Sequence, residues 1–260
     1  MKKICGLLAA LALLVATPAR ADEIKVMTSG AFTEAYQQLV EQFQKTTRHT
    51  VVTTYGASMG GAQDSIPVRL DRGEPVDVVI VIDAALEPLI KTGHVVTAGR
   101  VQLARSMIGI AVQKGAPRPD ISTIAALRQT LLQAKSIAYS ASASGTYVST
   151  ELFKRLGIAD QVKDKARRIE SERVGAVVAR GDAEIGFQQV SELLPVAGID
   201  YIGTLPAEVQ QVSIVSAAVA TKATARSAAR ELIDFLASST AAATIRQTGL
   251  EPIAHATPHK

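Results

Sequence analysis

The sequence predicts an α/β protein of two lobes, with a ligand cleft between them and two hinge strands that connect them. Three observations predict this fold. Strand-like and helix-like segments alternate from residue 24 to residue 91, which is the pattern of a parallel sheet covered by helices. A second alternation of the same kind begins near Met107. Residues 76–82 are almost all apolar, as expected of a parallel strand buried on both faces.

Each predicted element follows from hydrophobic periodicity and turn residues. Strands are expected at 24–27, 50–55, 76–82, 107–112, 136–139, 185–189 and 212–220, and helices at 32–45, 86–91, 121–134, 147–156, 174–180 and 225–237. One lobe is predicted to hold residues 22–104 with 212–260, and the other residues 105–211. The hinges are predicted at residues 105–109 and 210–214.

The first 21 residues are predicted to be a cleavable signal peptide. Lys2 and Lys3 precede an apolar run at 7–15 that is too short to span a bilayer. Small residues at 19 and 21 predict cleavage between Ala21 and Asp22. The mature chain is therefore expected in a periplasm. It has no further stretch of about 20 apolar residues, so no stable membrane insertion is expected after cleavage.

Composition limits the chemistry of the mature chain. Loss of the signal peptide removes Cys5, the single cysteine, so neither a disulfide nor a thiol nucleophile is expected. It also removes three of the 28 Lys and Arg residues, which leaves 25 against 24 acidic residues. This balance, without a basic run, argues against nucleic acid as a partner. The four histidines, at 49, 94, 255 and 258, have no metal-ligand spacing, so no metal is expected.

Polar turns follow apolar strands and precede helices at residues 28–31, 56–61 and 142–146. Each offers backbone N–H groups and hydroxyls near a helix start, where an anion is stabilised, although serine and threonine also cap helices. Arg69 and Arg173 could bind carboxylates, and Gln188 and Gln189 add amides at a strand end. The residue patterns alone leave a carboxylate, a tyrosine or a histidine as possible bases for proton transfer.

At these turns the chain resembles the periplasmic molybdate-binding proteins, a family with the type 2 periplasmic-binding-protein fold. The segments VMTSGAFT, YGAS, SGTY, ERV and GFQQ carry the resemblance, which covers most of residues 24–250. In that family two serine hydroxyls, backbone amides and a tyrosine hold the oxyanion. Ser58 keeps one serine, but the other falls on Ala31 and the tyrosine falls on Gln189. Residues 60–73 are also longer and differently composed than the family's segment.

With these departures the chain resembles the aconitate isomerase family. The segments that carry this resemblance are TSGAFTEAY, YGASMGGAQDSIPVRLDRGEPVDVV, SASGTY and ERVGAVVARGDAEIGFQQVSELLP. The resemblance implies interconversion of trans- and cis-aconitate, a small tricarboxylate, without a cofactor. The sequence does not identify the catalytic base; Glu172, Asp64 and Tyr147 are candidates because their motif positions place them near the predicted cleft. The expected ligand-binding residues are Thr28, Ser29, Gly30, Ser58, Met59, Gly60, Arg69, Ser142, Ser144, Gly145, Thr146, Arg173, Val174, Gln188 and Gln189.

A second hypothesis is a non-catalytic receptor that delivers an organic acid or an oxyanion to a transporter. It rests on the two-lobe scaffold, and a transporter partner is expected only in this case. Turnover of a tricarboxylate separates the two hypotheses.

Overall fold

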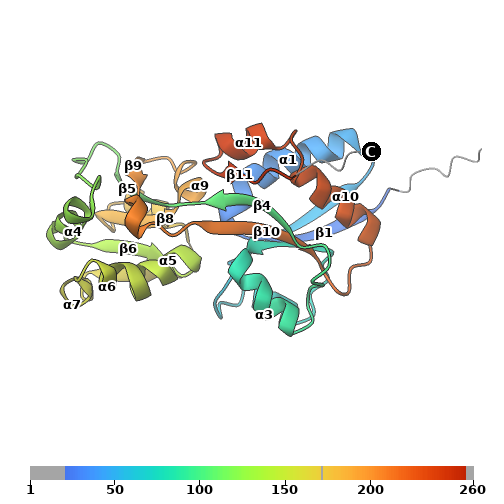
Figure 1. The fold of residues 1–260 in the computed structure, drawn as a ribbon, viewed down its shortest axis with the longest axis horizontal. Helices are drawn as coiled ribbons and strands as arrows, with labels where there is room; N and C mark the ends of the chain where they lie inside the picture. Colours follow the sequence, from blue (N-terminus) through green and yellow to red (C-terminus); the bar gives the residue numbers. More distant parts are fainter. Residues whose placement is uncertain (1–20, 171, 256–260) are drawn as a thin grey trace, which may run out of the picture.

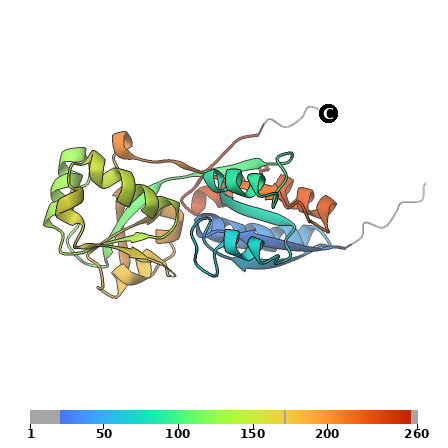
Figure 2. The ribbon, with the colours of Figure 1, turned by 90° about the horizontal axis from the view of Figure 1, so that it is seen from below.

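The computed structural model describes residues 21–170 and 172–255. The predicted signal peptide lies outside this part of the chain except for Ala21. The described residues form two lobes joined by long strands that run between them (Figure 1). Seen from below, the lobes are separate bodies with the connecting segments between them (Figure 2). This two-lobe α/β architecture is the one that the sequence predicts.

The first lobe is built on a six-stranded sheet in the order β11-β4-β10-β3-β1-β2. The strands are β1 (Glu23–Thr28), β2 (Thr50–Tyr55), β3 (Val78–Ile82), β4 (Val101–Ser106), β10 (Ser213–Val219) and β11 (Glu251–Pro252). β1 pairs in parallel with β2 and β3, as predicted, whereas β10 is antiparallel to β3 and β4. The sheet is therefore mixed, because the C-terminal part of the chain returns to it in the opposite direction.

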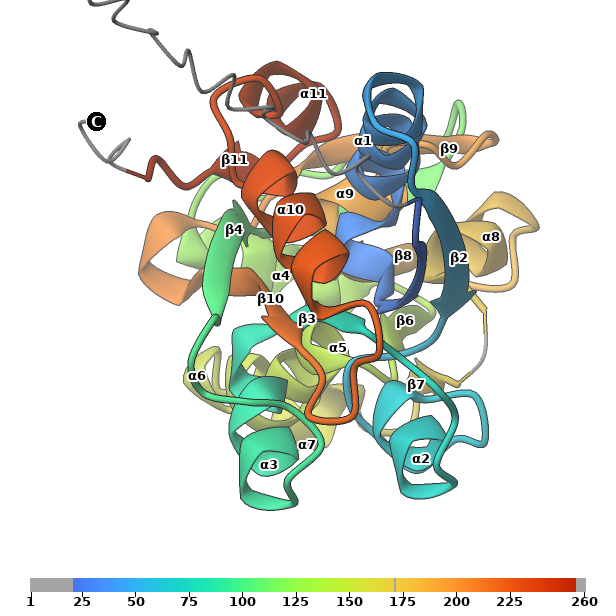
Figure 3. The ribbon, with the colours of Figure 1, turned by 90° about the vertical axis from the view of Figure 1, so that its right-hand side faces the viewer.

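Helices cover both faces of this sheet. α1 (Thr33–Thr46), α10 (Arg226–Leu236) and α11 (Ala242–Gln247) lie on one face, and α2 (Ile66–Asp71) and α3 (Leu86–Lys91) lie on the other (Figure 3). Alternate residues of β3 accordingly enter two cores: Ile80 packs with α1 and α10, and Val79 packs with α2 and α3. This double burial explains why β3 is apolar at every position.

The second lobe is built on a five-stranded sheet in the order β7-β6-β8-β5-β9. The strands are β5 (Ile108–Gln113), β6 (Ile137–Ser140), β7 (Ala166–Ile169), β8 (Ile185–Gln189) and β9 (Ile199–Thr204). The helices are α4 (Ile124–Gln133), α5 (Ala143–Tyr147), α6 (Phe153–Arg155), α7 (Ala159–Val162), α8 (Val174–Ala179) and α9 (Val190–Leu193). Four single turns complete the structure: η1 (Gly30–Phe32), η2 (Asp83–Ala85), η3 (Val148–Leu152) and η4 (Ala207–Val209).

The periodicity analysis missed the strands β4, β7, β9 and β11 and the short helices α7, α9 and α11. β7 and β9 are edge strands, and β7 carries two consecutive exposed arginines, so neither strand shows a buried face in its sequence. The helix predicted at 147–156 begins earlier, at Ala143, and runs through α5, a π-helical turn η3 and α6. Short polar strands and altered helical turns lack the simple period on which the prediction depended.

The chain crosses between the two sheets twice, at Met107 and over residues 205–212. Gln210 joins these crossings, because its side-chain amide accepts a hydrogen bond from Ile108 N–H at 3.0 Å and donates one to the Ile108 carbonyl at 3.0 Å. The lobe boundaries at 104/105 and 211/212 remain a prediction.

Candidate functional site

A cavity of about 420 Å³ lies where strand ends and turns of both lobes meet. This volume suits a small ligand. The lining residues are Ser29, Gly30, Ala31, Thr33, Gln37, Tyr55, Gly56, Ala57, Ser58, Asp64, Ile82, Ser140, Ala141, Ser142, Ile169, Glu170, Glu172, Arg173, Gln188, Gln189 and Glu192. The predicted binding residues Ser29, Gly30, Ser58, Ser142, Arg173, Gln188 and Gln189 are among them.

The turn after β1 contributes hydroxyls that the protein itself does not satisfy. Thr28 Oγ1 and Ser29 Oγ are both buried and have no hydrogen-bond partner. A buried hydroxyl without a partner lowers stability, so such groups are usually completed by a ligand or by water. Ser29 lines the cavity, whereas Thr28 does not. The Ser29 hydroxyl is therefore available to an anionic ligand.

The turn after β2 places Ser58 fully buried at the cavity wall. Its Oγ accepts a hydrogen bond from Ile82 N–H at 3.1 Å, which leaves the hydroxyl proton free to donate to a ligand. The next two residues of this turn do not line the cavity. Met59 lines a second cavity on the side of η2, and the Gly60 carbonyl accepts from Ser65 Oγ at 2.9 Å.

In the turn after β6, Ser142 is the predicted residue that reaches the cavity. Ser144 is buried behind it and shares a hydrogen bond of 3.0 Å with Ser140 Oγ. Gly145 packs directly on the Ser140 backbone, where any side chain would collide with it. Thr146 and Tyr147 line the second cavity instead. Glycine at this position therefore allows α5 to lie close to β6.

Among the residues that the structure describes, Arg173 is the one cationic side chain that lines the cavity. Its Nη2 donates to Glu34 Oε1 at 2.9 Å, and Glu34 lies on α1 in the other lobe, so this ion pair bridges the cleft. Val174, at the start of α8, does not line the cavity; its N–H donates to Gln188 Oε1 at 2.8 Å. A ligand carboxylate that binds Arg173 would compete with Glu34.

Gln189 lies at the junction of the lobes. Its Oε1 accepts from Ser106 Oγ at 2.8 Å and its Nε2 donates to Ser213 Oγ at 3.2 Å, and all three side chains are buried. These two serines stand at the ends of β4 and β10, next to the two crossings. Gln189 thus connects the strands that join the lobes, with part of its surface on the cavity.

The three predicted proton-transfer candidates differ in position. Glu172 is exposed at the rim, and two hydrogen bonds from Arg180 lower its pKa. Tyr147 lies outside the cavity; its hydroxyl donates to the Val209 carbonyl at 2.7 Å and accepts from Arg155 at 3.0 Å. Asp64 lines the cavity but is exposed.

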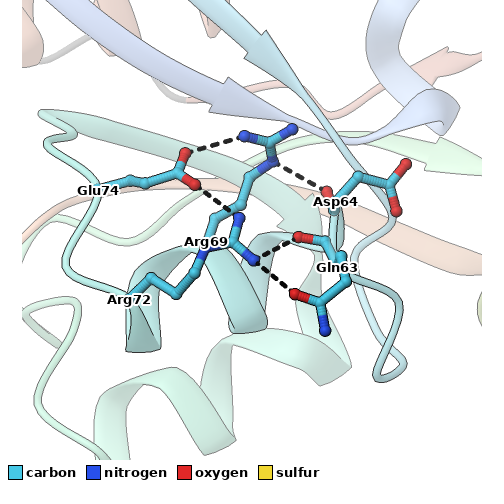
Figure 4. Close-up of polar contacts among 5 residues, drawn as sticks. All are labelled: Gln63, Asp64, Arg69, Arg72 and Glu74. Carbon is cyan, nitrogen blue, oxygen red and sulfur yellow. Dashed lines mark hydrogen bonds and ion pairs between the residues drawn. The ribbon is translucent and has the colours of Figure 1, made fainter.

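Arg69 supports the loop that carries Asp64. It donates from Nε to the Asp64 carbonyl at 3.1 Å and from Nη1 to Glu74 at 2.9 Å, while Arg72 binds Gln63 and Glu74 (Figure 4). The Asp64 carboxylate points away from both arginines. The structure therefore does not bring Arg69 to the cavity, and its contacts are those of a residue that orders the loop.

Sequence reasoning missed Glu192, which follows β8 on α9. It lines the cavity, is partly buried, and its Oε1 accepts from Gln188 Nε2 at 3.1 Å. Burial raises the pKa of this carboxyl to about 7, against the opposing attraction of Arg173 and the hydrogen bond from Gln188. No local period identifies Glu192, because Gln188 ends β8 and Glu192 lies on α9, so the fold and not a helical repeat brings the two side chains together.

Two searches of the described residues were negative. In residues 21–170 and 172–255, no group of three or more His, Cys, Asp and Glu side chains is arranged to hold a metal ion. None of the helices in this part of the chain has the length and apolar character that a membrane span needs.

Comparison with known proteins finds a family match over most of the chain. Residues 24–251 match the family of bacterial extracellular solute-binding proteins. The chain is 43% identical to an aconitate isomerase from Pseudomonas sp over 247 residues, which are 95% of this chain and 94% of that protein. It is 28% identical to the molybdate-binding protein ModA of Azotobacter vinelandii, over 91% of this chain and 92% of that protein.

Solved structures agree with this placement. The periplasmic molybdate-binding protein of Azotobacter vinelandii superposes with a TM-score of 0.67 at 22% identity, over 87% of this chain and 98% of that chain. The sulfate-binding protein SubI of Mycobacterium tuberculosis superposes with a TM-score of 0.69 at 19% identity, over 89% of this chain and 87% of that chain. At these identities the likeness shows the fold.

Proposed function

We propose that this chain, which belongs to the family of bacterial extracellular solute-binding proteins, is an isomerase that interconverts trans- and cis-aconitate in the cavity between its lobes. The observation that carries the proposal is the 43% identity, over 95% of the chain, to the aconitate isomerase of Pseudomonas sp. The molybdate-binding protein of Azotobacter vinelandii aligns over a similar length at 28% identity. The sequence is thus nearer to the enzyme than to that receptor.

The chemistry that the reaction requires is compatible with the cavity. Isomerisation removes a proton from the CH2 group beside the double bond and returns a proton to the other end of the resulting allylic carbanion. The new double bond can then have the other geometry. Charge builds on the carboxylate next to the carbanion, where hydroxyl and guanidinium donors lower its energy. We propose that Ser29, Ser58 and Arg173, which line the cavity, are these donors.

The substrate is a tricarboxylate, and the cavity is not uniformly positive. Of the acidic residues that line it, Glu172 is neutralised by Arg180 and Glu170 by Arg168 at the rim. One substrate carboxylate would take the place of Glu34 on Arg173, and the others would be held by hydroxyls and backbone N–H groups. The step moves a proton and needs no electron acceptor, so we propose that it uses no cofactor.

The test is turnover by the purified mature protein. Mixed with trans-aconitate in D2O and followed by proton NMR, it should form cis-aconitate and exchange deuterium into the allylic positions. Prior dialysis against a chelator should leave the rate unchanged. Neither product nor deuterium exchange would refute the proposed function.

A receptor function is the alternative, and the fold shared with sulfate- and molybdate-binding proteins favours it. The positions that the molybdate resemblance assigns to a serine and a tyrosine are Ala31 and Gln189, and the Gln189 amide already binds Ser106 and Ser213. Tight binding of a tricarboxylate or of molybdate in calorimetry, without turnover, would establish a receptor, and a transporter partner would then follow.

We also propose that the chain works in the periplasm after cleavage between Ala21 and Asp22. The charged and apolar segments of the first 21 residues support this, as does membership of an extracellular family. N-terminal sequencing of the exported protein should begin at Asp22.

A further inference from the structure

We infer that Glu192 is the catalytic residue that moves the proton, first as the base and then as the acid. This inference rests on the proposed isomerase function. In the first step the Glu192 carboxylate takes a proton from the substrate CH2 group, so that a C–H bond breaks and an O–H bond forms. The electron pair stays on the allylic system of the substrate. In the second step the Glu192 carboxylic acid returns the proton to the far end of that system, which restores the carboxylate.

Position separates Glu192 from the other acidic residues of the cavity. Asp64, Glu170 and Glu172 line the same cavity but are exposed to solvent. Glu192 is partly buried on α9, which packs against β5, β8, η1, α1 and α8. Partial burial favours the protonated form of a carboxyl and so makes its carboxylate a stronger base, so Glu192 is better suited to take the substrate proton than the exposed carboxylates.

Two contacts fix the Glu192 carboxylate without neutralising it. Gln188 donates to Oε1 at 3.1 Å from the end of β8. Gly30, across the cleft, lets the carboxylate approach the backbone of η1, since a methyl group there would lie 3.0 Å from Cδ and closer still to Oε1. Glu170 and Glu172 each form an ion pair with an arginine, whereas no described residue forms an ion pair with Glu192 within 4.0 Å.

The charged groups that face Glu192 come from two of the elements packed against it. Arg173, which precedes α8, attracts the carboxylate, and Glu34 of α1 binds Arg173 from the other lobe. β5, β8 and η1 carry no ionisable side chain, and β8 contributes the neutral amide of Gln188. Burial therefore dominates, and it raises the pKa of Glu192 to about 7. A group with this pKa takes up and releases a proton readily near neutral pH.

The other proton-transfer groups are less suited. The Glu172 carboxylate is held by Arg180, which lowers its basicity. Tyr147 is committed to the Val209 carbonyl outside the cavity. Among the described histidines, His49 contacts Glu231, His94 contacts Asp71 and His255 contacts the Gln102 carbonyl, and none lines the cavity.

The test compares the parent, Glu192→Gln and Glu208→Gln. Glutamine keeps the size of the side chain and its contact with Gln188 but cannot accept a proton. Glu208 is exposed on η4 and does not line the cavity, so it controls for the loss of one carboxylate. The measurements are trans-aconitate turnover and deuterium exchange by NMR, affinity by calorimetry, and folding by circular dichroism.

We expect Glu192→Gln to lose about 10²- to 10⁴-fold in turnover and to lose deuterium exchange, with its affinity within a few-fold of the parent. Glu208→Gln should match the parent. The kcat/KM of the parent should decrease as the pH is lowered below about 7, because the base must be ionised to take the proton. Glu192→Asp, which keeps a carboxylate, should recover part of the rate and should retain an acid limb.

The outcomes are distinguishable. A parent without turnover refutes the proposed function, and the role of Glu192 falls with it. An active parent together with an equally active Glu192→Gln overturns only the assignment of Glu192. Loss of affinity in parallel with turnover also overturns it, because Glu192 would then be a binding group. If Glu192→Gln fails to fold, Glu192→Asp decides: full activity with no change in the pH profile overturns the assignment.

Discussion

Gly30→Ala should separate the position of the Glu192 carboxylate from the stability of the fold. Gly30 begins η1, where alanine can adopt the backbone conformation. The new methyl would lie 3.0 Å from Glu192 Cδ. Ordinary contacts of a carbon atom are about 3.5–4.0 Å, and Oε1 would lie still nearer to the methyl than Cδ, so the carboxylate must retreat by roughly 1 Å. The atoms that the methyl meets belong to the end of one flexible side chain, so the backbone can stay in place.

A displacement of this size is large for proton transfer. A misplacement of about 1 Å can cost about 10²-fold in rate. We expect Gly30→Ala to lose roughly 10- to 100-fold in kcat, with little change in melting temperature, because alanine also reduces the entropy of the unfolded chain by about 0.4–1 kcal/mol. Gly61→Ala is the stability control, because its methyl meets no atom within 4 Å.

The assay is the NMR turnover measurement, with thermal unfolding followed in parallel. Parental kcat in a folded Gly30→Ala protein would refute the reasoning, since it would show that the carboxylate need not occupy its observed place. A large fall in melting temperature would refute the claim that the side chain alone moves.

Three further predictions follow from other contacts. Arg173→Ala should weaken trans-aconitate binding about 10- to 150-fold in calorimetry, because a hydrogen bond to a charged group contributes about 1.5–3 kcal/mol. Arg173→Lys should show the same loss if the planar guanidinium matters. Parental affinity in both variants would exclude Arg173 from the site. Asp77→Ala should lower the free energy of unfolding by about 2–4 kcal/mol, because this buried carboxylate accepts from the backbone N–H groups of Lys25, Thr224 and Ala225; urea denaturation tests this, and a loss below about 0.5 kcal/mol would contradict it. Glu192→Gln should become more stable relative to the parent as the pH rises from about 4.5 to about 8. The pKa of Glu192 in the folded protein, about 7, exceeds the usual 4.5, so the free energy of unfolding of the parent falls by up to roughly 3 kcal/mol over this interval. A constant difference in stability between the two proteins would contradict the burial of Glu192.

The sequence by itself determined the two-lobe α/β class and most of the helices and strands of the sheets. It could do so because these features depend on the spacing of apolar residues over short stretches of the chain. β3 is apolar at every position because both of its faces are covered, and α1 repeats its apolar residues at helical spacing. Polar turns that follow buried strands also identified Ser29, Ser58 and Ser142, because strand ends of a parallel sheet meet at one edge.

Only the tertiary structure decided what each polar side chain contacts. Arg69 binds Glu74, Tyr147 binds the Val209 carbonyl, and Arg173 binds Glu34 from the other lobe, although sequence reasoning had considered all three for the ligand or for proton transfer. The structure also brings Glu192 against Gly30, 162 positions apart in the chain. A pKa depends on burial and on neighbouring charges in space, and no local pattern in a sequence encodes these.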